Sequence, residues 1–222
     1  MPGVEFTPLL MSAFDRSLIP PEPDLSFEQV LWKAGLTSVA GIDEAGRGAL
    51  AGPVAAAAVI LPPEQKIRLR LKGVRDSKQL TPIQREKMRE RILQYAAAWG
   101  VGFASSAEID QLGILPATRL AACRALEAMI LLPSHILLDY ILLPDVFTPQ
   151  TALVKGDCRS LSIAAASILA KTSRDALMRE LDLVYPGYGF ARHKGYGTTA
   201  HRQAIRQLGV SPVHRHSFTL FP

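Results

Sequence analysis

The chain has 222 residues, of which 48% are hydrophobic and 20% are charged, a composition that excludes a disordered or fibrous protein and favours one globular domain. Lysine and arginine (25) outnumber aspartate and glutamate (20); the formal charge of +5 and the pI of about 9.4 suit a polyanionic partner. Cys123 and Cys158 are the only cysteines, which excludes a disulfide framework.

No segment of the sequence has the pattern of an export signal or a membrane anchor. The first twenty residues contain Glu5 and Asp15 among several prolines, and they lack a cationic start followed by an apolar run. The most apolar stretch, residues 49–61, contains a glycine and a proline and is shorter than the roughly 18 to 20 residues that a membrane span needs. We therefore expect a cytoplasmic protein that does not bind membranes.

The N-terminal residues differ in pattern from the rest of the chain. Residues 1–24 mix prolines and apolar residues without a period. Ser26 and Gln29 have the spacing of a capping box and predict a short helix that runs to about Ala34. We divide the chain into an N-terminal extension with a short helix, residues 1–37, and a main domain, residues 38–222.

The first half of this domain has the pattern of adjacent strands. Residues 39–43 are an apolar run that ends in an acid, and residues 54–61 are a second apolar run after a glycine-rich turn. Two neighbouring strands joined by a turn suggest a β-hairpin. A third strand is expected at residues 99–104.

Helical signals follow these strands. Six basic residues fall within residues 66–78, a polar, loop-like segment, and the run from Lys66 to Arg75 is interpreted as a solvated face. Thr81, Pro82 and Gln84 supply a cap, a first-turn proline and an amide three residues after the cap, and so predict the start of a helix. Further helices are expected at residues 116–131, 161–183 and 199–208, and short strands at residues 136–139 and 152–154. This order predicts an α/β fold with a mixed sheet.

Four acids stand at the ends of predicted strands or beside glycine: Asp43, Glu44, Asp139 and Asp157. A single acid at a strand end is usually solvated. Four acids that converge at one sheet repel one another and raise one another's pKa unless cations neutralise them. Oxygen ligands without a matching histidine or cysteine spacing select hard cations such as Mg²⁺ or Mn²⁺.

Paired ions of this kind are a standard device for phosphodiester hydrolysis, because one ion activates water while the other stabilises the leaving oxygen. The acids therefore indicate phosphoryl chemistry without a covalent protein nucleophile. The sequence has no Gly-x-x-x-x-Gly-Lys-Ser/Thr loop, so a nucleoside triphosphate is not the expected substrate.

The glycine-rich segment around the first two acids is more specific. Residues 39–48, VAGIDEAGRG, followed by Gly52-Pro53-Val54, resemble the opening signature of ribonuclease HII, the type-two ribonuclease H family. The resemblance spans about residues 38–219. Its other motifs follow in the expected order: DSK at 76–78, EID at 108–110, VKGD at 154–157, AAASILAK at 164–171, RD at 174–175 and GFARHKGY at 189–196.

The resemblance implies an α/β fold of the RNase H-like type, with a central five-stranded mixed β-sheet flanked by helices and a C-terminal helical segment. It implies that the four acids are both catalytic residues and the ligands of two Mg²⁺ or Mn²⁺ ions.

The resemblance also implies two substrate contacts. Gly46-Arg47-Gly48 is expected to contact the ribose 2′-hydroxyl, largely through main-chain atoms, and Tyr196 to read the RNA–DNA junction. Glycine lets a backbone approach a ligand closely, and the 2′-hydroxyl distinguishes RNA from DNA. Tyrosine offers a flat face for stacking and a hydroxyl for hydrogen bonding. Without its neighbouring motif, Tyr196 would be interpreted as a packed tyrosine.

The activity implied is hydrolysis of the RNA strand of RNA–DNA hybrids and cleavage 5′ of ribonucleotides embedded in duplex DNA, which leaves a 3′-hydroxyl and a 5′-phosphate. We expect a monomer with no obligate protein partner. Two alternatives remain open: another nuclease of the RNase H fold, such as an integrase or resolvase relative, and a non-catalytic module that binds hybrids.

Three positions depart from the family pattern. Tyr140 follows the third acid where the family commonly has glycine, Gly113 stands where asparagine is frequent, and His216 follows the His-Arg pair where arginine is frequent. None of these departures removes an acid. They affect the expected duplex contacts and the shape of the loop after Asp139.

Lys78 is the candidate phosphate contact among the basic residues, with a solvated lysine as the alternative, and Arg47 is a second candidate. Lys171 and Arg174 have helical spacing with Asp175 and are interpreted as structural ion-pairing residues. His193 and His214 lack zinc-ligand partners, and we interpret them as hydrogen-bonded surface groups.

Overall fold

The computed structural model describes residues 19–221, so the first 18 residues of the N-terminal extension lie outside the described part of the chain. Helix α1 (Ser26–Lys33) begins the described structure, as the sequence predicts, but the expected capping box is wrong. Leu25 is the N-cap and supplies no side-chain cap. Glu28 turns into the interior, where the hydroxyls of Ser160 and Ser162 donate to its Oε1 at 2.6 Å.

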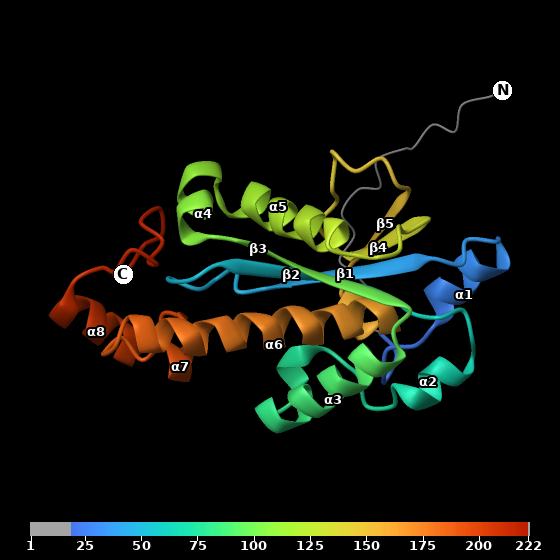
Figure 1. The fold of residues 1–222 in the computed structure, drawn as a ribbon, viewed down its shortest axis with the longest axis horizontal. Helices are drawn as coiled ribbons and strands as arrows, with labels where there is room; N and C mark the ends of the chain where they lie inside the picture. Colours follow the sequence, from blue (N-terminus) through green and yellow to red (C-terminus); the bar gives the residue numbers. More distant parts are fainter. Residues whose placement is uncertain (1–18, 222) are drawn as a thin grey trace.

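The central sheet has five strands in the order β3-β2-β1-β4-β5, which confirms the mixed sheet (Figure 1). β1 pairs antiparallel with β2, and β2 pairs antiparallel with β3, so the predicted hairpin is present. β1 pairs parallel with β4, and β4 pairs parallel with β5. The strands are β1 (Val39–Ala45), β2 (Val54–Ile60), β3 (Ala98–Ala104), β4 (His135–Asp139) and β5 (Gln150–Leu153).

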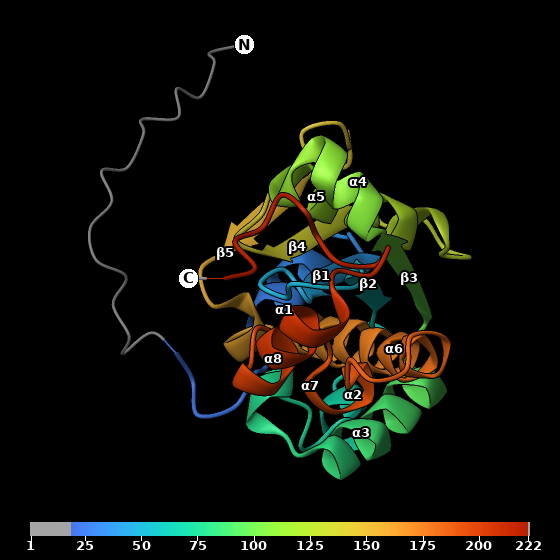
Figure 2. The same cartoon turned by 90° about the vertical axis from the view of Figure 1, so that its left-hand side faces the viewer.

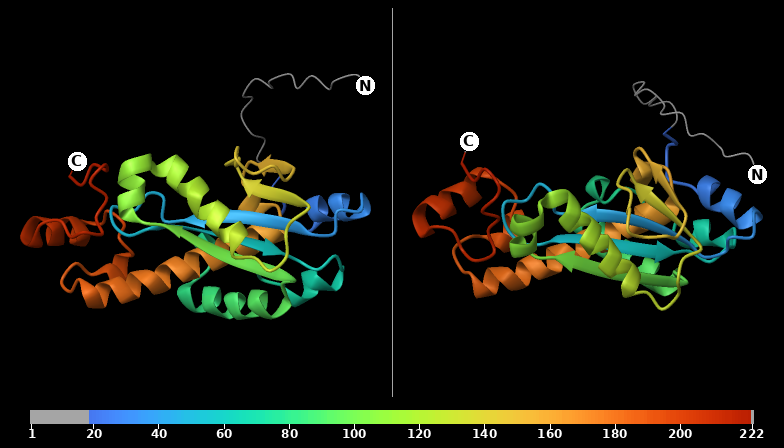
Figure 3. Two further views of the ribbon diagram at one scale, coloured as in Figure 1. Left: turned by 45° about the horizontal axis from the view of Figure 1, so that its top comes forward. Right: turned by 90° about the horizontal axis from the view of Figure 1, so that it is seen from above.

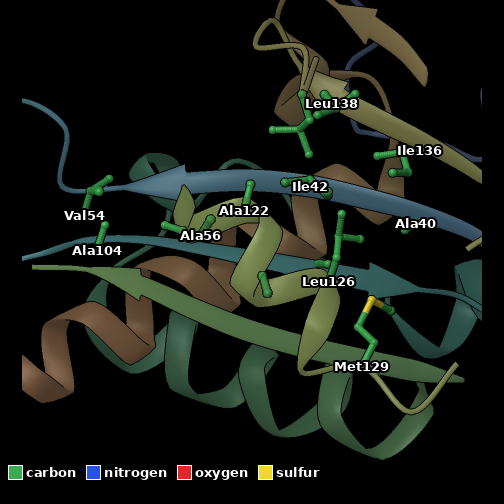
Figure 4. Packing of buried hydrophobic residues seen from close by; sticks show 14 of the residues in the cluster. Ala40, Ile42, Val54, Ala56, Ala104, Ala122, Leu126, Met129, Ile136 and Leu138 are labelled. Atoms are coloured by element: carbon green, nitrogen blue, oxygen red, sulfur yellow. The ribbon is translucent and has the colours of Figure 1, made fainter. Parts of the chain in front are cut away.

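One face of the sheet is covered by α5 (Ile114–Glu127) together with α4 (Ser106–Leu112), as Figure 1 shows. The sequence predicts α5 at residues 116–131 and gives no expectation of α4. Gly113 accounts for the boundary, because its φ of 84° ends α4 and begins α5 at one residue. α5 packs on β2 and β3 through a core that includes Ala56, Ala122 and Leu126 (Figure 4).

The opposite face is covered by α6 (Leu161–Val184), behind which lie α2 (Lys66–Arg70) and α3 (Pro82–Tyr95). The expectation of a loop at residues 66–78 is partly wrong, because its first five residues form α2. The capping box at Thr81 and Gln84 is confirmed at the start of α3. Two segments form short 3₁₀ helices, η2 (Ser77–Gln79) and η3 (Gly156–Cys158).

Small residues let both helix layers approach the sheet closely. A Cβ atom at Gly41 on β1 would lie 2.2 Å from the carbonyl carbon of Ser162 on α6, and one at Gly100 on β3 would lie 2.1 Å from the carbonyl oxygen of Ala125 on α5. Neither helix can therefore sit at its present depth over a larger residue. Among residues 19–221, no helix combines the length and apolar character that a membrane span requires.

The C-terminal segment returns to the sheet end where β1 stops. After α6, helices α7 (Phe190–His193) and α8 (Thr199–Leu208) lie beside the loop between β1 and β2 (Figures 2 and 3). Two isolated bridges fix this contact, Ala49 with Tyr196 and Ala51 with His214. The predicted C-terminal helical segment is thus part of the wall around the end of β1.

Candidate active site

Two neighbouring parallel strands bring three of the predicted acids together. Asp43 and Glu44 lie near the end of β1, and Asp139 is the last residue of β4. Because Ile42 on β1 is aligned with Leu138 on β4, the next residues of the two strands, Asp43 and Asp139, end side by side. The fourth acid, Asp157, comes from η3, directly before α6.

These side chains border a pocket of about 500 Å³ at the sheet end. Asp43, Glu44 and Asp139 line it. Asp157 is 3% exposed and lies close behind the pocket, near enough for its charge to raise the pKa of both Asp43 and Asp139. The rest of the wall consists of Ala45, Gly46, Arg47, Gly48, Ser77, Lys78, Lys171 and Tyr196. The pocket therefore contains every substrate-binding residue that the sequence predicts.

The electrostatics of the acids are unfavourable without a cation. Burial raises the pKa of Asp43 well above its ordinary value, and the charges of Glu44, Asp139 and Asp157 raise it further. Burial, followed by the charge of Asp157, likewise raises the pKa of Asp139. Burial also raises the pKa of Glu44, although Arg47 partly opposes this. Each acid would be easier to ionise if positive charge entered the pocket.

The donor atoms fit hard divalent ions. Asp157 Oδ1 is buried and has no hydrogen-bond partner among the described residues, so it retains a free lone pair. Asp139 Oδ1 is held in place by the Gly156 N–H, which donates to it at 2.8 Å. The site consists of carboxylate oxygens without histidine, which suits Mg²⁺ or Mn²⁺ better than zinc.

Asp76 and Cys158 bring further ligand atoms within 4.8 Å of those of Asp157. An ammonium group already lies beside this cluster, since Lys78 Nζ is 3.5 Å from Asp157 Oδ2 and 3.7 Å from Asp76 Oδ1. Lys78 thus partly neutralises the buried acids, while three-quarters of its side chain stays exposed, 76% by area.

The glycine-rich turn after β1 forms the opposite lip of the pocket. Gly46 has a φ of 91°, and a Cβ atom there would lie 1.9 Å from Arg174 Nε, so glycine is required on both counts. A Cβ atom at Gly48 would meet nothing within 4 Å, so that side of the turn is open. The Arg47 side chain folds back to Glu44, with 3.2 Å between Nη1 and Oε1.

Tyr196 forms the wall between this pocket and a second, basic hollow of about 320 Å³. Its ring centroid lies 5.5 Å from both Lys171 Nζ and the guanidinium carbon of Arg174. The basic hollow shares Lys171 and Tyr196 with the acidic pocket, and its other cationic lining residues are Arg85, Arg179, Arg192 and Lys194. A continuous surface therefore leads from the acids to a group of cations.

Two interpretations of the basic residues need correction. Lys171 does pair with Asp175 at 2.7 Å, but Arg174 makes no ion pair among residues 19–221 and instead donates to the carbonyl oxygens of Ala51, Pro53 and Lys194. His214, expected at the surface, is fully buried.

His193 is half-buried, and its ring nitrogens contact the Tyr188 carbonyl and the Gly195 N–H. Two further buried residues were not predicted from the sequence, His201 and Arg215. His201 stands three and four residues before Ala204 and Ile205, and this apolar helical spacing could have marked it as buried. Arg215 carries no comparable signal.

The three departures from the family pattern, Gly113 at the junction of α4 and α5, Tyr140 and His216, are not among the residues that line the pocket. Tyr140 has a φ of 68°, so the loop after Asp139 adopts a left-handed conformation without glycine. The backbone N–H of His216 donates to Asp110 at 2.9 Å, a bond that any residue at this position can make.

Comparison with known proteins places this architecture in a class. A solved structure described as the PCNA:RNase HII complex from Archaeoglobus fulgidus superposes with a TM-score of 0.68 at 26% identity, over 83% of this chain and 96% of the other. A mixed five-stranded sheet flanked by helices, with this likeness, defines a nuclease of the ribonuclease H fold.

Sequence comparison narrows the class to a family. The family model described as Ribonuclease HII matches residues 40–221. A ribonuclease HII of Synechococcus sp. is 57% identical over 197 residues, covering 89% of this chain and 88% of the relative. One of Dehalococcoides mccartyi is 52% identical over 201 residues, covering 88% and 92%. The chain belongs to the ribonuclease HII family and is an endonuclease of the ribonuclease H type.

Proposed function

We propose that this protein hydrolyses the RNA strand of RNA–DNA hybrids and cuts on the 5′ side of ribonucleotides embedded in duplex DNA, leaving a 3′-hydroxyl and a 5′-phosphate. One observation carries this proposal: the pocket that gathers the carboxylates is also lined by Gly46-Arg47-Gly48 and Tyr196. A site for phosphodiester hydrolysis and a surface suited to a ribose thus share one wall.

In this proposal Asp43, Glu44, Asp139 and Asp157 hold two divalent ions, Mg²⁺ or Mn²⁺. When bound, the ions activate the attacking water and stabilise the leaving oxygen. The carboxylates set the place and spacing of that charge. Support comes from the raised pKa of Asp43, caused first by burial and then by the neighbouring acids, and from the unpartnered Oδ1 of Asp157.

The glycine-rich turn supplies the ribose contact. Neither the Arg47 N–H nor the Gly48 N–H has a hydrogen-bond partner among residues 19–221, and the turn lines the pocket. Backbone donors at this point suit a 2′-hydroxyl, which both donates and accepts hydrogen bonds. Tyr196, on the other side of the pocket, offers its ring to the nucleotide beside the junction.

Cations around the pocket hold the sugar-phosphate backbone. Lys78 lies beside the acids with its side chain mostly exposed, and it can reach a phosphate from there. Phosphate contacts of this kind make affinity fall as salt rises, because counterions are released on binding. The protein would act as a monomer in the cytoplasm, with no obligate protein partner; the archaeal relative solved with PCNA makes a sliding clamp the first partner to test.

A single duplex experiment tests the proposal. The protein is incubated with DNA that carries one ribonucleotide, with a full RNA–DNA hybrid, and with the same duplex made only of DNA, each with Mg²⁺, with Mn²⁺ and with chelator. Cleavage of the first two, dependent on metal and 5′ of the ribonucleotide, supports it. Cleavage of the all-DNA duplex would favour an integrase- or resolvase-like activity, and binding without cleavage a hybrid-binding module.

A further inference from the structure

Two consecutive buried residues, His214 and Arg215, connect the C-terminal segment to both sides of the pocket. Each is 0% exposed. Arg215 forms no ion pair in the described part of the chain; its buried charge is balanced by carbonyl dipoles and by the Phe218 ring, whose centroid lies 5.1 Å from the guanidinium carbon. A buried guanidinium without a carboxylate is costly, and its contacts therefore need a reason other than stability.

The guanidinium of Arg215 holds the glycine-rich turn by its carbonyl groups. Nη2 donates to the Gly46 oxygen and Nη1 to the Arg47 oxygen, both at 2.8 Å, while Nε donates to the Gly52 oxygen at 3.0 Å. Two successive carbonyls thus point to the same planar fork. A lysine ammonium cannot reproduce this arrangement, because it is a point charge on a flexible stem.

This grip determines where the turn's N–H groups point. The peptide bonds are trans, so the N–H of each peptide group points away from its own C=O. When Arg215 draws the Gly46 and Arg47 carbonyls inward, the N–H groups of Arg47 and Gly48 turn outward. These are the two donors without a partner among residues 19–221, on a turn that lines the pocket.

The neighbouring His214 acts on the other side of the pocket through a second histidine. The Ser211 N–H donates to His214 Nδ1 at 2.9 Å, so the His214 proton sits on Nε2, 3.1 Å from His201 Nε2. His201 Nδ1 lies 3.0 Å from the Tyr196 carbonyl oxygen, which can only accept. Each ring thus has one possible tautomer. A series of hydrogen bonds therefore connects Ser211, through both histidines, to the Tyr196 backbone.

We propose that the pair His214-Arg215 positions the two parts of the ribonucleotide reader: Arg215 aims the backbone donors of Gly46-Arg47-Gly48, and His214, through His201, fixes the backbone of Tyr196. Neither residue lines the pocket, so selection of the 2′-hydroxyl depends on side chains remote from the substrate. This inference rests on the proposed function and adds the residues that set its specificity.

Binding without turnover tests the arginine. Affinities are measured in Ca²⁺ for a duplex with one ribonucleotide and for the matched all-DNA duplex. Wild type should prefer the ribonucleotide by about threefold to tenfold for each hydrogen bond made to the 2′-hydroxyl. Arg215→Lys should reduce this ratio towards one. Ile92→Ala, a truncation at a fully buried position on α3, is the control for lost stability and should keep the ratio.

The outcomes separate the two proposals. A wild type without preference for the ribonucleotide would contradict the proposed function itself. A preserved ratio in a folded Arg215→Lys would overturn only the role of Arg215. If that variant does not fold, amide hydrogen exchange in wild type decides: the Arg47 and Gly48 amides should exchange rapidly in the free protein and slow only with the ribonucleotide duplex. Protection before substrate is added would overturn the inference.

The role of His214 is tested by comparing a disruptive substitution with a conservative one. His214→Leu removes the donor to His201, whereas His214→Gln keeps a nitrogen donor of similar reach. We expect the leucine variant to lose preference for cleavage at the RNA–DNA junction over cleavage inside a hybrid, and the glutamine variant to recover most of it. Equal loss in both variants, or in neither, would overturn the role of His214.

Discussion

Lys78 Nζ lies 3.5 Å from Asp157 Oδ2, so an ammonium group stands beside the acids that we propose as metal ligands. Burial acts to lower the pKa of Lys78, but the carboxylates of Asp76, Asp157 and Asp43 together outweigh it and raise the pKa above its ordinary value. Lys78 therefore stays charged throughout the working pH range. The same charge that attracts a phosphate also repels a metal ion.

These two effects predict opposite changes in a Lys78→Met variant. Its affinity for the substrate duplex should fall, and the slope of log affinity against log salt should decrease by about one, because one phosphate contact is lost. Its apparent affinity for Mg²⁺ in the absence of substrate should rise. Titrations by fluorescence anisotropy and by calorimetry measure the two quantities.

Lys33→Met is the matched control for this prediction. Lys33 is exposed on α1, which leads into the start of β1, whereas the acids lie towards its end. We expect neither the salt slope nor the metal affinity to change in this variant. An unchanged salt slope in Lys78→Met would remove Lys78 from the substrate-binding residues.

Asp43→Asn should abolish turnover and yet stabilise the metal-free protein. Folding raises the pKa of Asp43, first through burial and then through its acidic neighbours. The stability linked to this group is complete below the unfolded pKa and is lost as pH rises through the folded pKa. Removing the charge at neutral pH should raise Tm by a few degrees, since each kcal/mol corresponds to about 2–4 °C in a protein of this size.

Thermal melts in chelator from pH 4 to pH 8 measure this effect. The gain of Asp43→Asn over wild type should grow with pH, and added Mg²⁺ should stabilise wild type more than the variant. A variant that is less stable than wild type in chelator would contradict the electrostatic argument. Circular dichroism at 25 °C confirms that the variant is folded before its activity is measured.

The fold was predictable where the signal is local. The capping box at Thr81 and Gln84 lies within four residues, and the structure contains it. The start of α1 was not, because the residue before its N-cap, Asp24, is held by backbone hydrogen bonds with Arg159 and Leu161, more than 130 residues away, and the N-cap residue supplies no side-chain cap. Helix α4 has too few apolar positions in seven residues to display a helical period, but its capping box, Ser105 with Glu108, is a local signal that could have predicted it.

The candidate site likewise has features that the sequence shows and features that only the tertiary structure shows. Acids at strand ends are visible in the sequence, but the adjacency of Asp43 and Asp139 follows from the parallel pairing of β1 with β4, which strand patterns alone do not specify. Arg215 was not predictable by any sequence argument, because its partners are backbone carbonyls, and a carbonyl is present at every residue. These hydrogen bonds are a property of the tertiary structure alone.

His201 should make the protein sensitive to acid. Burial, together with the nearby His193 and His214, lowers the pKa of His201 to about 4. The stability that depends on neutral His201 is present above the unfolded pKa of about 6.5 and is lost as pH falls through about 4. The cost of protonating this group alone is on the order of 2–3 kcal/mol across that window.

Urea unfolding at pH 7 and at pH 4.5 measures this loss. His201→Gln should be less stable than wild type at pH 7 but should lose less stability between the two pH values. His216→Gln, a change at an exposed histidine, should keep the wild-type dependence. Equal pH dependence of stability in wild type and His201→Gln would show that folding does not lower the pKa of His201.

Gly41→Ala should destabilise the protein and displace the acid on η3. The added Cβ would lie 2.2 Å from the carbonyl carbon of Ser162 and 2.4 Å from the amide nitrogen of Ile163, both in the backbone of α6, so no side chain can move aside. Overpacking costs about 1–3 kcal/mol where side chains can adjust, and more is expected against a helix backbone. Because α6 begins four residues after Asp157, pushing it away from β1 also moves that carboxylate.

Gly48→Ala separates the effect of an added methyl group on stability from its effect on substrate binding. Its added Cβ meets nothing within 4 Å, so its melting temperature should match that of wild type, while the methyl group intrudes on the substrate side of the turn and weakens binding of the ribonucleotide duplex. Calorimetric melts and duplex titrations of both variants check the pair. If Gly41→Ala melts within a degree of wild type, β1 and α6 can separate at little cost, and the position of Asp157 does not depend on their contact.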